Sequence, residues 1–141
     1  MPDPDNLQRF VDAQAPVFAA VVGELTDGEK RSHWMWFVFP QIAGLGLSPK
    51  SVFYAIASLD EAKAYLAHPV LGPRLLDCAR LVLESEGRTA QQIFGAVDAM
   101  KFRSSMTLFA AAAPGKSVFQ DCLDAFFDGA PDPATLTKLG R

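Results

Sequence analysis

The sequence has few metal-binding and redox-active residues. It contains only two cysteines, Cys78 and Cys122, which lie far apart and in no disulfide, metal or redox spacing. We therefore expect reduced thiols that pack as small hydrophobic side chains. The only two histidines, His33 and His68, share no ligand-like spacing with each other or with the cysteines. We accordingly predict no metal site and no cofactor.

Long hydrophobic runs and an excess of basic charge are also missing. No apolar run approaches the roughly 20 residues that a membrane-spanning helix requires. The first five residues, Met1 to Asp5, are acidic and proline-rich, unlike a secretory leader. The 13 Lys and Arg against 16 Asp and Glu give a net charge of −3, which argues against nucleic acid as a partner. We expect a soluble cytoplasmic protein with neither a nucleic-acid nor a membrane partner.

The composition is that of a folded globular protein. Hydrophobic residues make up 50% of the 141-residue chain and charged residues 21%, far from a disordered composition. A chain of this length can bury a core without disulfides. No repeat, linker or low-complexity tract divides it. We predict a single domain over residues 1–141, with an ordered core over residues 5–139 and short frayed termini.

Helix-start signals recur along the chain. A capping residue followed three positions later by Glu or Gln lets each side chain satisfy a backbone N–H group of the other. Each such pair precedes a run of apolar residues with helical spacing. The sequence thus predicts an all-α fold, a single compact multihelical domain of about seven to nine helices, several of them short. The pairs are Asp5/Gln8, Ser58/Glu61, Thr89/Gln92 and Ser117/Gln120.

The second half of the predicted helix 98–113 is apolar all round, which indicates a buried central helix with Asp98 as its cap. Ser32 is expected to cap helix 33–38, for which a buried strand is the competing interpretation. Residues 41–49 form a loop, and residues 51–57 are ambiguous between a short helix and an extended segment. The other predicted helices cover residues 6–14, 16–25, 58–67, 70–86, 89–94, 117–128 and 133–139, the last capped by Asp132.

Residues 114–117 read Pro-Gly-Lys-Ser, which matches the end of the phosphate-binding loop pattern G-x-x-x-x-G-K-[ST]. The first glycine of that pattern would fall at Ala110, inside a predicted helix. Without that glycine the loop cannot bend so that its N–H groups converge on a phosphate. Ser117 is better explained as a helix cap, and the sequence argues against an ATPase.

The segment from Arg31 to Gln41 contains both tryptophans, Trp34 and Trp36, together with His33. Aromatic clusters are usually core, and we favour that interpretation, in which His33 and the indole N–H groups are satisfied structural groups. The alternative is a binding site. Its cations, hydroxyls and ring faces would suit an anionic ligand.

A second polar block lies at the start of the predicted central helix. Lys101, Ser104 and Ser105 would share one side of that helix, and Arg103 and Thr107 would share another. Hydroxyl groups in a buried helix need partners. We favour the structural interpretation, in which they bond back to the preceding turn or allow close helix packing. In the functional interpretation they line a pocket.

Together the two blocks form a candidate site for a small anionic metabolite, with nucleotide-like molecules among the candidates. No nucleophile elbow or triad context accompanies them, so no catalytic residue is assigned and enzymatic activity stays open. The alternative function is a non-catalytic protein–protein interaction domain. The candidate ligand-binding residues are Arg31, Ser32, His33, Trp34, Trp36, Gln41, Lys101, Arg103, Ser104 and Ser105.

Several stretches resemble one protein family. They read R-S-H-W-M-W-F-V-F-P-Q, then Y-A-I-A-S-L-D-E-A-K-A-Y-L-A-H-P-V-L-G-P-R-L, then I-F-G and K-F-R-S-S-M-T-L-F-A. From Asn6 to about Leu139 the chain resembles the bacterial family catalogued as domain of unknown function 1810. This resemblance implies a mainly α-helical fold and carries over no activity. Some members are labelled calpastatin, a disordered inhibitor, and that label does not fit the composition of a packed domain.

Overall fold

The computed structural model describes residues 3–115 and 117–141, so Met1, Pro2 and Lys116 lie outside the described residues. The described chain forms ten α-helices without a strand, which confirms the all-α prediction. One isolated parallel bridge joins Ile42 to Ile56. The helices are α1 (Gln8–Gln14), α2 (Phe18–Thr26), α3 (Met35–Val38), α4 (Pro49–Phe53), α5 (Leu59–Ala67), α6 (Leu71–Glu84), α7 (Ala90–Phe94), α8 (Ala96–Ala112), α9 (Val118–Phe127) and α10 (Pro133–Lys138).

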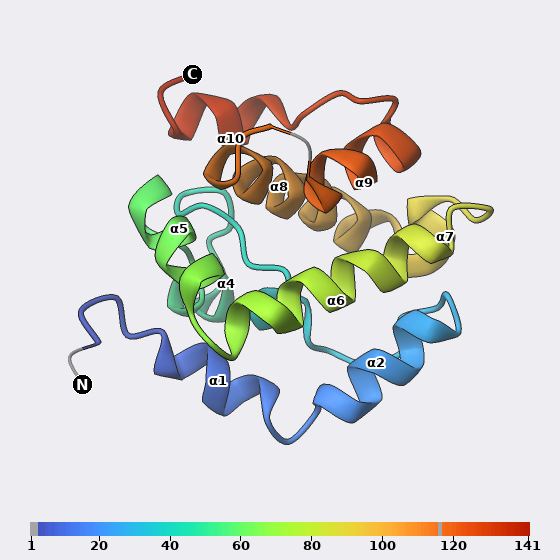
Figure 1. The fold of residues 1–141 in the computed structure, drawn as a ribbon, viewed down its shortest axis with the longest axis horizontal. Helices are drawn as coiled ribbons and strands as arrows, with labels where there is room; N and C mark the ends of the chain where they lie inside the picture. The colour runs from blue at the N-terminus through green and yellow to red at the C-terminus, as the bar shows by residue number, and fades with distance from the viewer. Residues whose placement is uncertain (1–2, 116) are drawn as a thin grey trace.

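The helix α8 is the centre of the fold. It packs against α5, α7, α9 and α10, while α6 packs against α2, α5 and α9. In Figure 1, α9 and α10 lie along one edge of the molecule and α1 and α2 along the opposite edge, with α6 and α8 between them. The six consecutive residues 104–109 are all buried, which is more than one helical turn. Their burial confirms the prediction of a buried central helix over this stretch.

Much of the core is built from aromatic side chains. Phe102 of α8 stacks on Phe94 at 4.8 Å between ring centroids and meets the edge of Phe39 at 5.0 Å. Phe39 also lies 6.2 Å from the ring of Trp34, which is 1% exposed. Such pairs add about 0.5–1.5 kcal/mol each beyond the area that they bury. The aromatic segment therefore supplies part of the core, as the structural interpretation expects.

In three of the four predicted capping pairs, the first residue caps its helix. The hydroxyl groups of Ser58, Thr89 and Ser117 each accept a hydrogen bond from the backbone N–H group three residues later. At Thr89 the reciprocal bond from its own N–H group to the side chain of Gln92 completes a capping box. These starts are decided by local side-chain chemistry, which makes them readable from sequence.

The predicted cap at Asp5 is wrong. The carboxylate of Asp3 instead accepts the N–H groups of Leu7 at 2.8 Å and Gln8 at 3.0 Å. Asn6 has a left-handed backbone conformation with φ of 51°, and the backbone N–H group of Asn6 bonds to the Asp3 carbonyl group. Because the Asp3 carboxylate accepts the N–H groups of Leu7 and Gln8, α1 begins at Gln8, two residues later than predicted.

The predicted cap at Asp98 is also wrong. The helix α8 begins at Ala96, directly after Gly95, whose φ of 84° favours glycine. Asp98 lies within the first turn, and its carboxylate is 2.9 Å from the Nζ atom of Lys30. The ion pair joins the chain before the aromatic segment to the start of α8.

The ambiguous stretch 51–57 is helical only in its first part. The helix α4 begins at Pro49, with the hydroxyl group of Ser48 accepting the N–H group of Ser51. Pro at the first helical position suits this start because its missing N–H group has no helical partner. Within residues 3–115 and 117–141, no helix combines the length and the apolar character needed to span a bilayer.

Candidate functional site

Glu24, which no sequence motif marked, organises the start of the aromatic segment. Its carboxylate accepts the N–H groups of Arg31 at 2.6 Å and Ser32 at 2.9 Å, the Ser32 hydroxyl at 2.5 Å and the Trp34 indole N–H at 3.0 Å. Burial acts to raise the pKa of Glu24, but these bonds outweigh it and hold the pKa at about 2. Ser32 therefore does not cap a helix, and α3 begins only at Met35.

The other polar side chains of this stretch point to solvent. The guanidinium group of Arg31 lies 3.1 Å from Asp27 and 3.8 Å from Glu29, and its side chain is 52% exposed. His33 is exposed and makes no hydrogen bond or ion pair with any described residue. Neither Arg31 nor His33 lines the groove that contains Lys101.

Arg103 of α8 holds the loop between α9 and α10. Its Nε atom donates to the carbonyl oxygen of Ala130 at 3.0 Å, and a terminal nitrogen donates to that of Pro131 at 3.0 Å. The guanidinium carbon lies 5.8 Å from the ring centre of Phe127. These contacts are with the protein itself, and Arg103 is not among the residues that line the groove containing Lys101.

Asp132 collects the hydroxyl groups of the second polar block. Its Oδ2 atom lies 3.1 Å from the Ser104 hydroxyl and accepts the Thr135 N–H group at 3.1 Å and hydroxyl at 2.6 Å. The Asp132 N–H group donates to the Thr107 hydroxyl at 2.8 Å. Asp132 thus caps α10, as predicted, and also joins α10 to α8.

Two of the three hydroxyl groups bond back to the preceding turn, which is one of the two roles that the structural interpretation gave them. Ser104 and Thr107 each bond back to a carbonyl group of the preceding turn, at 3.1 and 2.8 Å. Ser105 is fully buried, and its hydroxyl group has no partner among the described residues. Its small side chain lies in the enclosed part of α8.

A surface groove of about 330 Å³ lies between the loop that precedes α4, the first turns of α8 and the start of α10. Three of the predicted ligand-binding residues line it, namely Gln41, Lys101 and Ser104. Asp132 also lines it. The complete lining is Gln41, Leu45, Gly46, Ser51, Val97, Met100, Lys101, Ser104, Asp132 and Ala134.

Beside this groove two ammonium groups approach the ring of Trp36. The Nζ atom of Lys50 is 4.7 Å from the ring centre and that of Lys101 is 5.1 Å. Lys101 lies 3.6 Å from one oxygen of Asp98, whose other oxygen is 2.9 Å from Lys30. One carboxylate is shared by two lysines, so this end of the groove carries excess positive charge. Lys50 forms no ion pair within the described chain.

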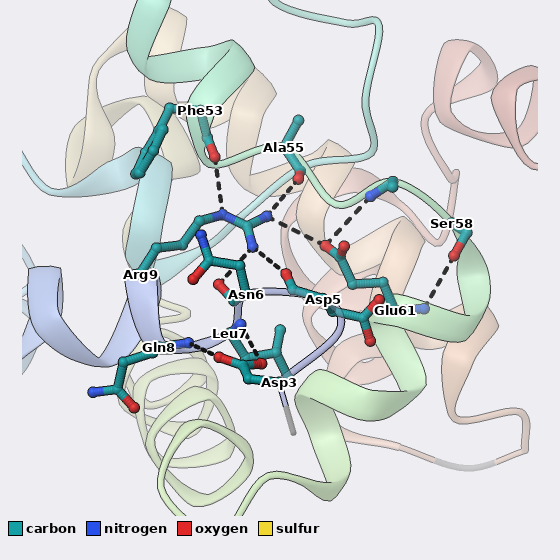
Figure 2. Close-up of polar contacts among 11 residues, drawn as sticks. Asp3, Asp5, Asn6, Leu7, Gln8, Arg9, Phe53, Ala55, Ser58 and Glu61 are labelled. Atoms are coloured by element: carbon teal, nitrogen blue, oxygen red, sulfur yellow. Dashed lines mark hydrogen bonds and ion pairs between the residues drawn. The ribbon is translucent and has the colours of Figure 1, made fainter. Parts of the chain in front are cut away.

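A separate polar cluster centres on Arg9 (Figure 2). Each of the five guanidinium N–H groups has an acceptor, so none is left for a ligand. Burial raises the pKa of Glu61, outweighing the nearby cation. The cluster fastens α1 to the segment that follows α4. Its acceptors are the carbonyl oxygens of Asp5, Asn6, Phe53 and Ala55 and the carboxylate of Glu61.

No metal site is present in the described part of the chain, where no group of three or more His, Cys, Asp or Glu side chains could hold an ion. Both cysteines are free and buried. Burial raises the pKa of the Cys78 and Cys122 thiols to about 12. They are protonated packing residues at neutral pH.

Comparison with known proteins gives two matches. A family model described as "Protein of unknown function (DUF1810)" matches residues 4–139. The crystal structure of the conserved hypothetical protein Rv1873 from Mycobacterium tuberculosis is 52% identical, with 99% of each chain covered and a TM-score of 0.96. The search of curated proteins found no match. Neither description names an activity or a ligand.

Proposed function

The chain belongs to the DUF1810 family of proteins of unknown function, and we propose that it binds a small anionic metabolite in the groove beside Trp36. The observation that carries the proposal is the pair of ammonium groups, from Lys50 and Lys101, at 4.7 and 5.1 Å from the Trp36 ring centre. Lys101 is partly enclosed, and phosphate and carboxylate groups bind most strongly to such a cation, while the exposed Lys50 adds a second positive charge.

The local charge favours an anion although the whole chain is acidic. Lys30 and Lys101 share the single carboxylate of Asp98, and Lys50 forms no ion pair within the described residues, so the ammonium groups near Trp36 are only partly neutralised. The whole chain carries −3. The side chain of Lys101 is only 23% exposed, so water screens it less than a surface lysine.

The rest of the groove suits a small organic molecule. Gln41 and Ser51 supply neutral hydrogen-bonding groups, and Leu45, Val97 and Met100 supply apolar wall. Such a lining would orient a carbon skeleton while the lysines hold its anionic group. Of the ten residues predicted from sequence, the proposal retains Trp36, Gln41, Lys101 and Ser104.

The two tryptophans provide a test by nuclear magnetic resonance. Each has one indole N–H signal, and that of Trp34, which is bonded to Glu24, serves as an internal reference. Phosphorylated and carboxylated metabolites should shift the Trp36 signal. Lys101→Met should abolish the shift, while Lys63→Met, which changes an exposed lysine on α5, should leave it unchanged. Equal shifts in wild type and Lys101→Met would refute the proposal, as would a metabolite panel that never moves the signal.

A second candidate function is self-association through exposed apolar side chains, two of which, Val97 and Met100, line the groove. Large exposed apolar side chains mark interaction surfaces when they gather on one face. The protein would then sediment as a dimer whose dissociation is favoured by Leu47→Ser together with Val97→Ser. A monomer at every concentration would exclude it. The exposed side chains are Leu47 (90%), Val97 (72%), Val52 (63%), Phe53 (55%) and Met100 (53%).

A further inference from the structure

One oxygen of a nearly buried carboxylate in the groove has no partner. Asp132 is only 9% exposed, and its Oδ2 atom receives every hydrogen bond that the carboxylate accepts from the described residues. Its Oδ1 atom accepts none, and Asp132 lines the groove. Among the described residues, Ser105 Oγ is the only buried side-chain oxygen or nitrogen without a partner, so Oδ1 of Asp132 is reached by solvent and can accept a hydrogen bond from water or from a ligand. The groove therefore presents an acceptor that a ligand can satisfy.

The identity of the ligand rests on the proposed function. We propose that this ligand is a phosphate monoester that also carries hydroxyl groups, as sugar phosphates and nucleotides do. A phosphate monoester bears up to two negative charges, which matches the two ammonium groups of Lys50 and Lys101. A ligand hydroxyl donates to Oδ1 of Asp132. A neutral donor fits better than an ammonium group, because the excess positive charge of the groove repels a cation.

A matched pair of probes tests the inference. Ribose 5-phosphate and pentyl phosphate share a phosphate monoester and five carbons, and only the first has hydroxyl groups. With the Trp36 indole signal as the readout, ribose 5-phosphate should bind wild type about tenfold or more tightly than pentyl phosphate, as expected for a hydrogen bond to a charged group. Asp132→Asn should erase this preference. Asn caps a helix as well as Asp does, so α10 should remain folded.

Thr135→Val is the control for the cap. It removes the 2.6 Å bond to Oδ2 and leaves Oδ1 untouched, so it should lower the melting temperature and keep the preference for ribose 5-phosphate. If Thr135→Val erases the preference as well, the geometry of the cap and not Oδ1 explains it, and the inference is overturned.

The two proposals fail in different ways. If both esters bind wild type equally and Lys101→Met weakens both, the hydroxyl inference is overturned while the anion site stands. If neither ester shifts the Trp36 signal but a carboxylated metabolite does, the phosphate inference is overturned while the anion site stands, and if no metabolite of the panel shifts it, both proposals are refuted. The inference is supported if wild type prefers ribose 5-phosphate to pentyl phosphate, Asp132→Asn loses this preference and Thr135→Val keeps it.

Discussion

Glu24→Gln tests whether the Glu24 carboxylate stabilises the fold by bonding to the start of the aromatic segment. The folded protein holds the pKa of Glu24 at about 2 against an ordinary 4.5, so the ionised carboxylate should stabilise the fold by about 3 kcal/mol at neutral pH. Replacing Glu24 with glutamine removes the negative charge. The amide N–H group of the glutamine would then face groups that donate hydrogen bonds to the carboxylate, among them the Ser32 hydroxyl. Urea unfolding at pH 7 should show a loss of about 3 kcal/mol.

The pH dependence has a definite sign. Because folding depresses this pKa, its stabilisation is present above pH 4.5 and is lost as the pH falls toward 2. The difference between wild type and Glu24→Gln should therefore shrink to about half or less near pH 3. Glu29→Gln, at an exposed partner of Arg31, should change stability by about 0.5 kcal/mol or less. Equal unfolding free energies at pH 7, or a difference that is independent of pH, would refute the reasoning.

Three further predictions concern packing and burial. A Cβ atom at Gly72 would lie 2.1 Å from the carbonyl oxygen of Leu66, so Gly72→Ala should lower the melting temperature by several degrees, whereas Gly87→Ala, with nothing within 4 Å, should not. Arg9→Ala should cost about 3–5 kcal/mol in urea unfolding, because it leaves its buried carboxylate partner unpaired; a cost below about 1 kcal/mol would contradict that role. Both thiols should react with a thiol reagent only at the rate of unfolding, and rapid labelling of the folded protein at pH 8 would contradict their burial.

The helix starts that depend on short-range hydrogen bonds could be predicted from the sequence. Ser58, Thr89 and Ser117 cap their helices through side chains three residues from the N–H groups that they serve. Several of the contacts that sequence reasoning missed join distant segments. Arg9 bonds to carbonyl groups 44 and 46 residues away, and no periodicity marks it.

The candidate site could be predicted only in part, because its residues come from distant segments of the chain. Lys101 and Ser104 were recognisable because polar residues in a buried helix need partners. Lys50 and Asp132 were not, since Lys50 falls between the predicted loop 41–49 and the ambiguous stretch 51–57, and Asp132 looked like an ordinary cap. Arg103 was included on its charge, yet the fold directs it to the loop after α9. Whether the predicted residues bind a ligand stays a prediction.

A crystal structure of the protein with ribose 5-phosphate would show whether the groove beside Trp36 binds the ligand. The account predicts the phosphate group within hydrogen-bonding distance of Lys101 and a sugar hydroxyl on Oδ1 of Asp132. A second hollow of about 480 Å³ borders Arg9, whose donors are all occupied. Density for the ligand in that hollow, with the groove beside Trp36 empty, would contradict the account.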